Sequence, residues 1–285
     1  MSKKIGVLLD SCSGISQREA KTMGVHIIPT PFFVNGELFL EDVTMSVDDL
    51  YEILKEDADV TTSQPSPGDL INKVDELLKE YEQIIYIPIS AGLSSSYSTG
   101  EMVARDYENK LFVLDVRRVA GSQKAAASNV LRLIKNGDDG ATIKQKMESN
   151  KGNSSVYLAV ENIDRLKKGG RVTPTAAAIG NILNIKPVLV IGTDKIESFT
   201  KVRGMKAAKR KMLAAIANEL ETKFAGKDVI INVLSSAPYN ETVDWLKEAS
   251  ARFPAHAITA EKIAATVACH TGVGCLAITC SEIVH

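Results

Sequence analysis

The sequence has little of what marks several common protein classes. It contains four cysteines and no C-x-x-C pair, which argues against a structural zinc site and predicts free thiols in a reducing compartment. No uninterrupted apolar run reaches transmembrane length, and the first residues show no cleavable signal pattern, so a cytoplasmic location is expected. A formal net charge of -1 lacks the basic excess typical of nucleic-acid binders.

Familiar catalytic motifs are also missing. The sequence has no P-loop, no G-x-G-x-x-G after a strand and no G-x-S-x-G elbow. Few acidic residues stand at positions where they could act as a general acid or base. We therefore expect no metal and no cofactor, and look for function among hydroxyl groups, backbone N–H groups and histidines.

The length of the chain favours two domains, since 285 residues exceed what a single core usually organises. Residues 1–152 alternate strand and helix patterns, as expected of an α/β domain with a mostly parallel sheet. A polar stretch at residues 150–154 is the expected linker to a second α/β domain over residues 153–285. Asn35-Gly36 between apolar runs predicts a hairpin flap at about residues 25–40.

A loop rich in Thr, Ser and Pro, residues 61–68, precedes a strongly amphipathic helix pattern. Ser66 stands where an N-cap belongs, with Pro67 after it and Asp69 three residues later. Thr62 and Ser63 therefore lie just before a helix N-terminus, where unpaired N–H groups suit an anion. An ordinary, well-capped loop would explain the same residues.

A second hydroxyl-rich turn follows the apolar strand pattern of residues 84–89. It carries Ser94 and Ser95 and leads into another predicted helix. Asp10 and Ser11 likewise follow the first strand, although a capping role alone would explain them. Ligands gather at the carboxyl ends of parallel strands, so these turns are expected to face one crevice.

His270 is the histidine most suited to a ligand site. We expect it in a glycine-bent loop, residues 270–274, between predicted strands at residues 263–268 and 276–279. Hydroxyls, amides and an imidazole together could hold a carboxylate. Two other interpretations stay open: a structural histidine in a turn, or a Ser94 nucleophile with His270 as its base, for which no third residue is apparent.

Several of these segments together resemble the DegV family of bacterial fatty-acid-binding proteins, the FakB-type subunits of fatty acid kinase. The similarity runs nearly end to end. The segments that carry it are Asp10-Ser11, Thr62-Ser63-Gln64-Pro65-Ser66-Pro67-Gly68, Ile89-Ser90 through Leu93-Ser94 with Tyr97, Leu166-Lys167-Lys168-Gly169-Gly170-Arg171, Ile185-Lys186-Pro187, Lys201-Val202-Arg203 and His270-Thr271-Gly272. The chain departs from the usual family pattern at Ser95-Ser96, which replace Gly-Thr, and at Val273, which replaces proline.

The resemblance implies a fold and a function. The fold would be a three-layer α/β/α N-terminal domain and a two-layer α/β sandwich with a mixed sheet at the C-terminus. One long-chain fatty acid would lie in a tunnel between them, with its carboxylate held by Thr62, Ser94 and His270. The chain itself would not be an enzyme, because a separate kinase subunit would phosphorylate the carboxylate to an acyl phosphate for phospholipid synthesis.

Further residues are assigned to the carboxylate site, to the ligand tail or to partner docking from the chemical type of their side chains. Ser63 and Ser95 are accessory candidates for the carboxylate. A stretch of small residues at 173–183 suggests tail contacts at Ala177, Ile179 and Leu183, although helix packing would explain it equally. Basic residues in and near a predicted helix at residues 204–224 could dock the kinase or contact an anionic membrane transiently, and the alternative is a solvated face. The docking candidates are Arg171, Arg203 and Lys206, with Lys209, Arg210 and Lys211 on the same helix.

Two other functions compete with the carrier. The first is an enzyme, either a hydrolase using Ser94 and His270 or a substrate-binding subunit like those of dihydroxyacetone kinases. The second is a scaffold or regulator without an internal cavity.

Overall fold

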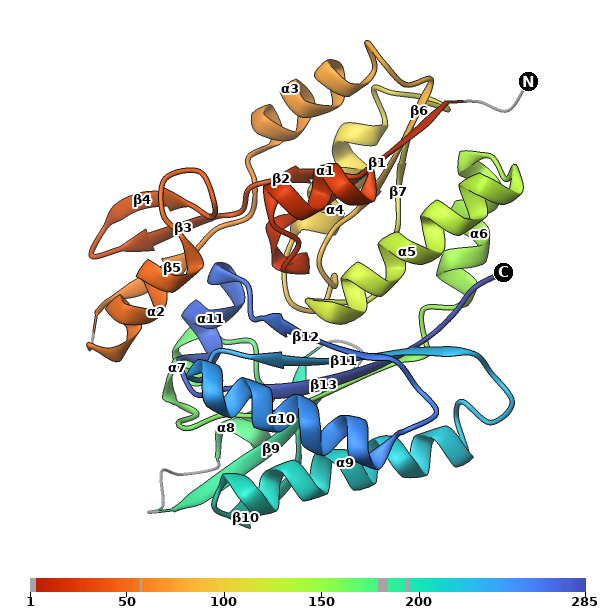
Figure 1. Ribbon diagram of the computed structural model, residues 1–285. Helices are drawn as coiled ribbons and strands as arrows, with labels where there is room; N and C mark the ends of the chain where they lie inside the picture. Colours follow the sequence, from red (N-terminus) through yellow and green to blue (C-terminus); the bar gives the residue numbers. More distant parts are fainter. Residues whose placement is uncertain (1–3, 57, 179–183, 193–194) are drawn as a thin grey trace.

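Two β-sheets form the centre of the molecule, one in each half of the chain (Figure 1). The computed structural model describes residues 4–56, 58–178, 184–192 and 195–285. The first sheet has four parallel strands in the order β2-β1-β6-β7. These strands are β1 (Ile5–Asp10), β2 (His26–Ile28), β6 (Gln83–Ile87) and β7 (Leu111–Val113).

Helices cover both faces of this parallel sheet. On one face, Val7 and Leu9 of β1 pack against α1 (Gln17–Met23), α5 (Gly121–Asn136) and α6 (Gly140–Ser149). On the other, Leu8 packs against α3 (Pro67–Leu77) and α4 (Ser96–Ala104). Alternate residues of a strand point to opposite faces, so both faces of β1 are apolar. The predicted three-layer α/β/α arrangement is confirmed.

The second sheet is mixed and has six strands in the order β10-β9-β8-β13-β11-β12. Only β11 and β12 pair in parallel among the described strands of this sheet. The strands are β8 (Ser154–Ala159), β9 (Ile185–Ile191), β10 (Ile196–Arg203), β11 (Val229–Ser235), β12 (Ile258–Lys262) and β13 (Leu276–Glu282). The mixed sheet expected in the second half is confirmed.

The outer face of the mixed sheet is covered by two long helices, α9 (Met205–Glu221) and α10 (Tyr239–Arg252). Trp245 of α10 is fully buried there, and its indole N–H donates to the carbonyl oxygen of Ala277 at 2.9 Å. Within the described ranges, no helix is both long enough and apolar enough to cross a membrane.

The inner face of the mixed sheet packs against the first half of the chain. Leu158 and Leu234 of this face share one hydrophobic cluster with Phe32, Leu50 and Ile89 from the first half. The same cluster includes residues of α2 (Val47–Lys55), α7 (Asp164–Gly169), α8 (Pro174–Ala177) and α11 (Ala265–Thr271). The two halves thus share a continuous core, and the candidate site lies within it.

The predicted flap is shorter than residues 25–40. Its hairpin consists of β3 (Pro31–Val34) and β4 (Glu37–Leu40), and β5 (Val60–Thr62) pairs with β3. The preceding strand β2 belongs instead to the parallel sheet, where His26 is in register with Leu8. Pro29, which has no N–H, separates β2 from the hairpin, and Thr30 N–H donates to Ser11 Oγ at 3.0 Å rather than to a strand.

The prediction of a strand at residues 263–268 followed by a glycine-bent loop was wrong. Residues 265–271 form the helix α11, and His270 lies in its last turn. Gly272 ends the helix at a φ of 74°, and its N–H donates to Ala268 O at 2.7 Å. At the other end, Ala265 N–H donates to Oε1 of Glu41, a residue 224 positions earlier in the chain, at 3.0 Å.

Glu41 is expected to make folding stability depend on pH. Burial raises the pKa of its carboxyl from 4.5 to about 7. Between these two pH values the Glu41 carboxyl keeps its proton in the folded protein but loses it in the unfolded chain. The free energy of unfolding therefore falls as pH rises from about 4.5 through about 7. In Glu41→Gln the amide oxygen still accepts from Ala265 but does not titrate. The unfolding free energy of the variant, measured with urea, should rise relative to wild type by about 3 kcal/mol between pH 4.5 and pH 8.

Glu41 is the only titrating group that differs between wild type and variant, although the charge of the nearby Asp10 also contributes to the raised pKa of Glu41. The pKa of Asp10 is raised to about 6 by burial and the pKa of His270 is lowered to about 4, but both residues are present in wild type and variant alike. Glu37→Gln, at the exposed start of the strand β4 that precedes Glu41, is the matched control. A difference between Glu41→Gln and wild type that stays constant with pH would contradict the prediction.

Candidate ligand-binding site

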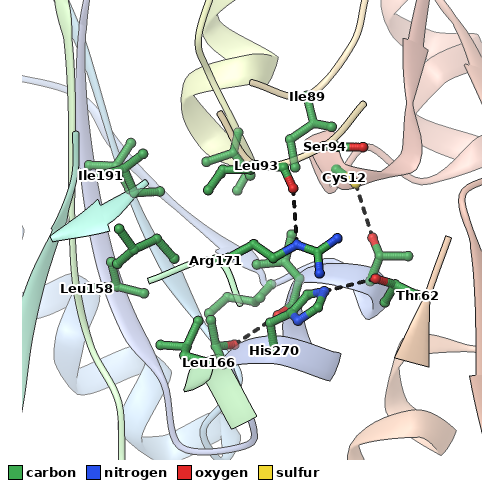
Figure 2. A pocket seen from close by; sticks show the side chains of 18 of the residues that line it. Cys12, Thr62, Ile89, Leu93, Ser94, Leu158, Leu166, Arg171, Ile191 and His270 are labelled. Carbon is green, nitrogen blue, oxygen red and sulfur yellow. Dashed lines mark hydrogen bonds between the residues drawn. The ribbon is translucent and has the colours of Figure 1, made fainter. Parts of the chain in front are cut away.

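A cavity lies between the two halves of the chain, walled by residues from both (Figure 2). Its volume is about 110 Å³, several times the roughly 10–15 Å³ that one enclosed water needs. Most of the wall is apolar, and Arg171 is the one charged side chain among the described lining residues. The apolar wall includes Ile89, Leu93, Val119, Val156, Leu158, Leu166, Ile191, Ile196, Leu234, Ile263 and Ala277.

Two of the predicted site residues meet directly at this cavity. Thr62 Oγ1 at the end of β5 lies 2.9 Å from His270 Nε2 in α11, although 208 positions separate them in the sequence. The imidazole also packs closely against Gly169, where an added Cβ would collide with Nδ1. Glycine at position 169 therefore leaves the space that the ring occupies.

The electrostatic state of His270 follows from its surroundings. Burial and the positive charge of Arg171 lower the pKa of His270 to about 4, so the imidazole is neutral near pH 7. A neutral ring carries one proton. With that proton on Nε2 the ring donates to Thr62 Oγ1, and the hydroxyl hydrogen of Thr62 is then free to point to a ligand.

The third predicted residue, Ser94, lines the same cavity from the turn before α4. Its Oγ lies 2.9 Å from Ser96 Oγ and accepts the N–H of Ser96 at 3.2 Å. Ser63 also lines the cavity. Ser95 is exposed at the start of α4 and is not among the described lining residues.

Arg171 has a different position from the one assigned to it by sequence. The sequence suggests a partner-docking role for Arg171, and in the structure its side chain is part of the cavity wall. Its Nε donates to Leu93 O at 3.3 Å and its Nη1 donates to Gly169 O. The guanidinium thus lies close to both His270 and the Ser94 turn, where it supplies the positive charge that the neutral imidazole lacks.

The apolar lining also differs from the predicted tail contacts. It comes largely from the inner face of the mixed sheet, including Leu158 of β8 and Leu234 of β11. Ala177 packs against the same hydrophobic cluster but is not among the described lining residues. The other two predicted contacts, Ile179 and Leu183, lie outside the described residues.

Of the residues at and just after the end of β1, Asp10 supports the site without lining the cavity, and Cys12 is part of the cavity wall. Asp10 is fully buried and accepts from Ile89 N–H at 2.7 Å and from Gln123 Nε2 at 2.9 Å. Cys12 lines the cavity with its Sγ 3.2 Å from Thr266 Oγ1, and burial raises the pKa of its thiol. All four cysteines are buried and free, as predicted.

The geometry does not favour a serine hydrolase. Among the described residues no hydrogen bond joins Ser94 to His270, since Ser94 pairs with Ser96 and His270 with Thr62. A histidine with a pKa of about 4 is also a weak general base near pH 7. The site has the features of a binding pocket: an apolar wall with hydroxyls, an imidazole and a guanidinium at one place.

The other docking candidates are exposed on the second half of the chain. Arg203 ends β10 and Lys206 lies in the first turn of α9, followed by exposed Arg210 and Lys211. Lys209 differs, because its Nζ pairs with Glu248 at 3.0 Å and lies over the ring of Trp245.

Known proteins resemble this chain over nearly its full length. The model of the DegV family, described as uncharacterised proteins, matches residues 4–282. A DegV domain-containing protein of Staphylococcus aureus strain N315 is 26% identical over 280 residues, covering 98% of both chains.

Solved structures have the same fold. A structure described as DegV, a fatty acid binding protein from Bacillus subtilis, has a TM-score of 0.87 and 26% identity, and the match covers 99% of this chain and 100% of that one. A stearic acid-binding protein from Eubacterium ventriosum has a TM-score of 0.88 at 20% identity, with 99% and 98% of the two chains covered.

Proposed function

The chain belongs to the DegV family, and from this we propose that it binds one long-chain fatty acid in the cavity between its two halves. The observation that carries the proposal is the composition of the cavity wall, which is mostly apolar and includes the polar side chains of Thr62, Ser94, Arg171 and His270. A molecule with one anionic end and a long apolar remainder matches this distribution. The relative from Bacillus subtilis described as fatty acid binding adds support.

The proposed head-group site has to compensate for the burial of a carboxylate. An unpaired ion in an apolar site is too costly to persist, and hydrogen bonds to charged groups contribute about 1.5–3 kcal/mol each. Thr62 and Ser94 offer hydroxyl donors, and neutral His270 fixes the orientation of the Thr62 hydroxyl. Arg171 offers the compensating charge from within the same wall.

The proposal predicts that the protein retains a lipid through purification. Native mass spectrometry should show the mass of the chain plus one fatty acid, and organic extraction should release that acid for identification. The apolar wall explains the retention, since each buried methylene contributes about 0.8 kcal/mol. A protein that is free of lipid and does not take up palmitate when it is offered would contradict the proposal.

We propose further that the bound acid is presented to a separate kinase subunit. That subunit would transfer a phosphoryl group from a nucleoside triphosphate to the carboxylate, giving an acyl phosphate for phospholipid synthesis. In this scheme the chain is a carrier without catalytic residues. Its exposed basic residues near the start of α9 are the proposed docking surface, with transient contact to an anionic membrane as a second use.

Charge reversal tests the docking surface. The double variant Lys206→Glu with Arg210→Glu should lower the rate of kinase-dependent acyl phosphate formation about tenfold at low salt, because opposite charges speed association and like charges slow it. Palmitate affinity should be unchanged, since neither residue lines the cavity. Lys79→Glu with Lys110→Glu, a reversal of exposed residues in the first half, is the matched control. Equal rates for the two double variants would remove this surface from the proposal.

A further inference from the structure

The flap and its neighbouring helix contribute their buried side chains to the core of the second half of the chain. We call β3, β4, α2 and β5, with the described residues between them, the flap unit. Its buried apolar residues belong to the cluster that also contains Leu158 and Leu234 of the mixed sheet, and they are Phe32, Val34, Leu50, Leu54 and Val60. None of the described residues of the flap unit belongs to the two clusters that flank the parallel sheet.

The rest of the first half, residues 4–30 and 63–150, meets this shared cluster at the cavity. We call these residues the parallel-sheet unit. Its described members of the cluster all line the cavity, and they are Cys12, Ile89, Leu93, Val119 and Ala120. The cavity therefore lies at a boundary, with the parallel-sheet unit on one side and the flap unit with the second half on the other.

The flap unit is held to the second half by both packing and polar contacts. Among the described helices and strands outside the flap unit, α11 packs against it most extensively, through α2, β3 and β5. The hydroxyl of Tyr51 donates to the carbonyl oxygen of Ile263 at 2.5 Å, and Lys262 Nζ lies 2.6 Å from the carboxylate of Asp48. These contacts add to the cap that Glu41 provides to α11.

An open groove of about 600 Å³ separates the flap unit from α1. Gln17 and Arg18 line it from α1, whereas Thr44 and Ser46 line it from the flap unit. A groove of this size holds solvent rather than packed side chains. Displacing the flap unit relative to α1 would therefore break little packing at this boundary.

We propose that the flap unit and the second half move as one body relative to the parallel-sheet unit, and that a fatty acid enters and leaves when the two bodies rotate apart. This inference rests on the proposed function. Ile89 lies in one body and Leu158 in the other, so rotation would open the apolar cavity between them. Thr62 and His270 belong to the same body, and their hydrogen bond would survive the opening.

The covalent chain restricts how the bodies can rotate. It crosses between them at residues 29–30, 63–65 and 150–153, so the rotation axis has to pass near these crossings. Beside the first crossing, Ser11 Oγ accepts from Thr30 N–H at 3.0 Å and also interacts with the Glu41 carboxyl. At the last, Asn150 Nδ2 donates to Glu282 Oε2 at 2.9 Å. Displacements near an axis are small, and these contacts can therefore persist during the motion.

Cross-links in the full-length protein test the proposal. The double variant Arg18→Cys with Thr44→Cys places thiols on both sides of the groove, and a flexible bis-maleimide joins the two bodies there. The double variant Asp48→Cys with Lys262→Cys, joined by the same reagent, links two parts of one body. The native cysteines are all buried, so the reagent spares them. The measurement is the rate at which radiolabelled palmitate leaves the protein when excess unlabelled palmitate is added.

The link across the groove should slow palmitate release at least tenfold, whereas the link within one body should change it by less than twofold. Each double variant before cross-linking is its own matched control. The inference is overturned if the link across the groove leaves the release rate unchanged. It is also overturned if the link within one body slows release as much, because the flap unit would then move independently of the second half. Failure of the unlinked protein to bind palmitate would instead overturn the proposed function.

Discussion

Replacing Thr62 with alanine is expected to weaken palmitate binding by about 10- to 100-fold. The change removes a hydroxyl donor from the proposed carboxylate site and takes away the hydrogen-bond partner of His270. A hydrogen bond to a charged group contributes about 1.5–3 kcal/mol, and each 1.4 kcal/mol corresponds to a factor of ten in affinity. Displacement of a fluorescent fatty acid from lipid-free protein measures the change.

Thr62→Ser is the matched control, because it keeps the hydroxyl and removes only a methyl group. Its palmitate affinity should stay within a few-fold of wild type. Urea unfolding of Thr62→Ala establishes that the variant is folded, so that a loss of binding can be attributed to the site. Palmitate affinity equal to that of wild type in folded Thr62→Ala would show that Thr62 does not hold the head group.

The affinity for saturated fatty acids should rise about fourfold with each added methylene in the range from octanoate to dodecanoate. Most of the described residues that line the cavity are apolar, and Leu158, Ile191 and Leu234 are among them. Burying one methylene contributes about 0.8 kcal/mol, so four methylenes contribute about 3 kcal/mol, or roughly 200-fold in affinity. Competition titrations with octanoate, decanoate and dodecanoate measure the slope.

Dodecanol is the control for the head group in this series. It has the same tail as dodecanoate but no carboxylate, so it should bind much more weakly than the acid. Equal affinities for octanoate and dodecanoate would mean that the tail lies in solvent, and the apolar cavity would then lose its proposed role.

Local sequence patterns predicted the elements whose signals lie close together in the chain. The helix α3 begins as expected, with Ser66 Oγ accepting from Asp69 N–H at 3.0 Å and Pro67 in the first turn. The alternation of strand and helix in the first half also predicted a parallel sheet. The start of α3 needed only a few neighbouring residues, and each strand or helix in the alternation was recognised from about a dozen.

The helix α11 could not be predicted in the same way, because its capping group comes from far away in the sequence. Its own N-cap residue is Ala264, which has no side-chain acceptor, and the acceptor for Ala265 N–H is Glu41, which directly follows the distant hairpin. A short apolar run that contains the β-branched residues Thr266 and Val267 and has no local cap predicts a strand. The position of His270 on a helix therefore depends on tertiary structure.

The candidate site was predicted in part. The meeting of Thr62 with His270 came from the resemblance to a family, since nothing in the spacing of two residues 208 positions apart indicates contact. The role of Arg171 was missed because its partners are backbone carbonyls of Leu93 and Gly169, which leave no pattern in the sequence. The apolar lining was missed because both faces of β8 are buried, so its sequence lacks the alternation that would mark the ligand side.

The cavity takes its walls from both halves of the chain, Ile89 and Val119 from one and Leu158 and Leu234 from the other. An acyl chain held there would fill the interior space that the halves share and so become a component of the hydrophobic core. Its departure would remove packing contacts from both halves of the chain at once. By thermodynamic linkage, the loaded carrier would then resist heat and proteolysis better than the empty one, and the cell could clear empty carriers faster than loaded ones.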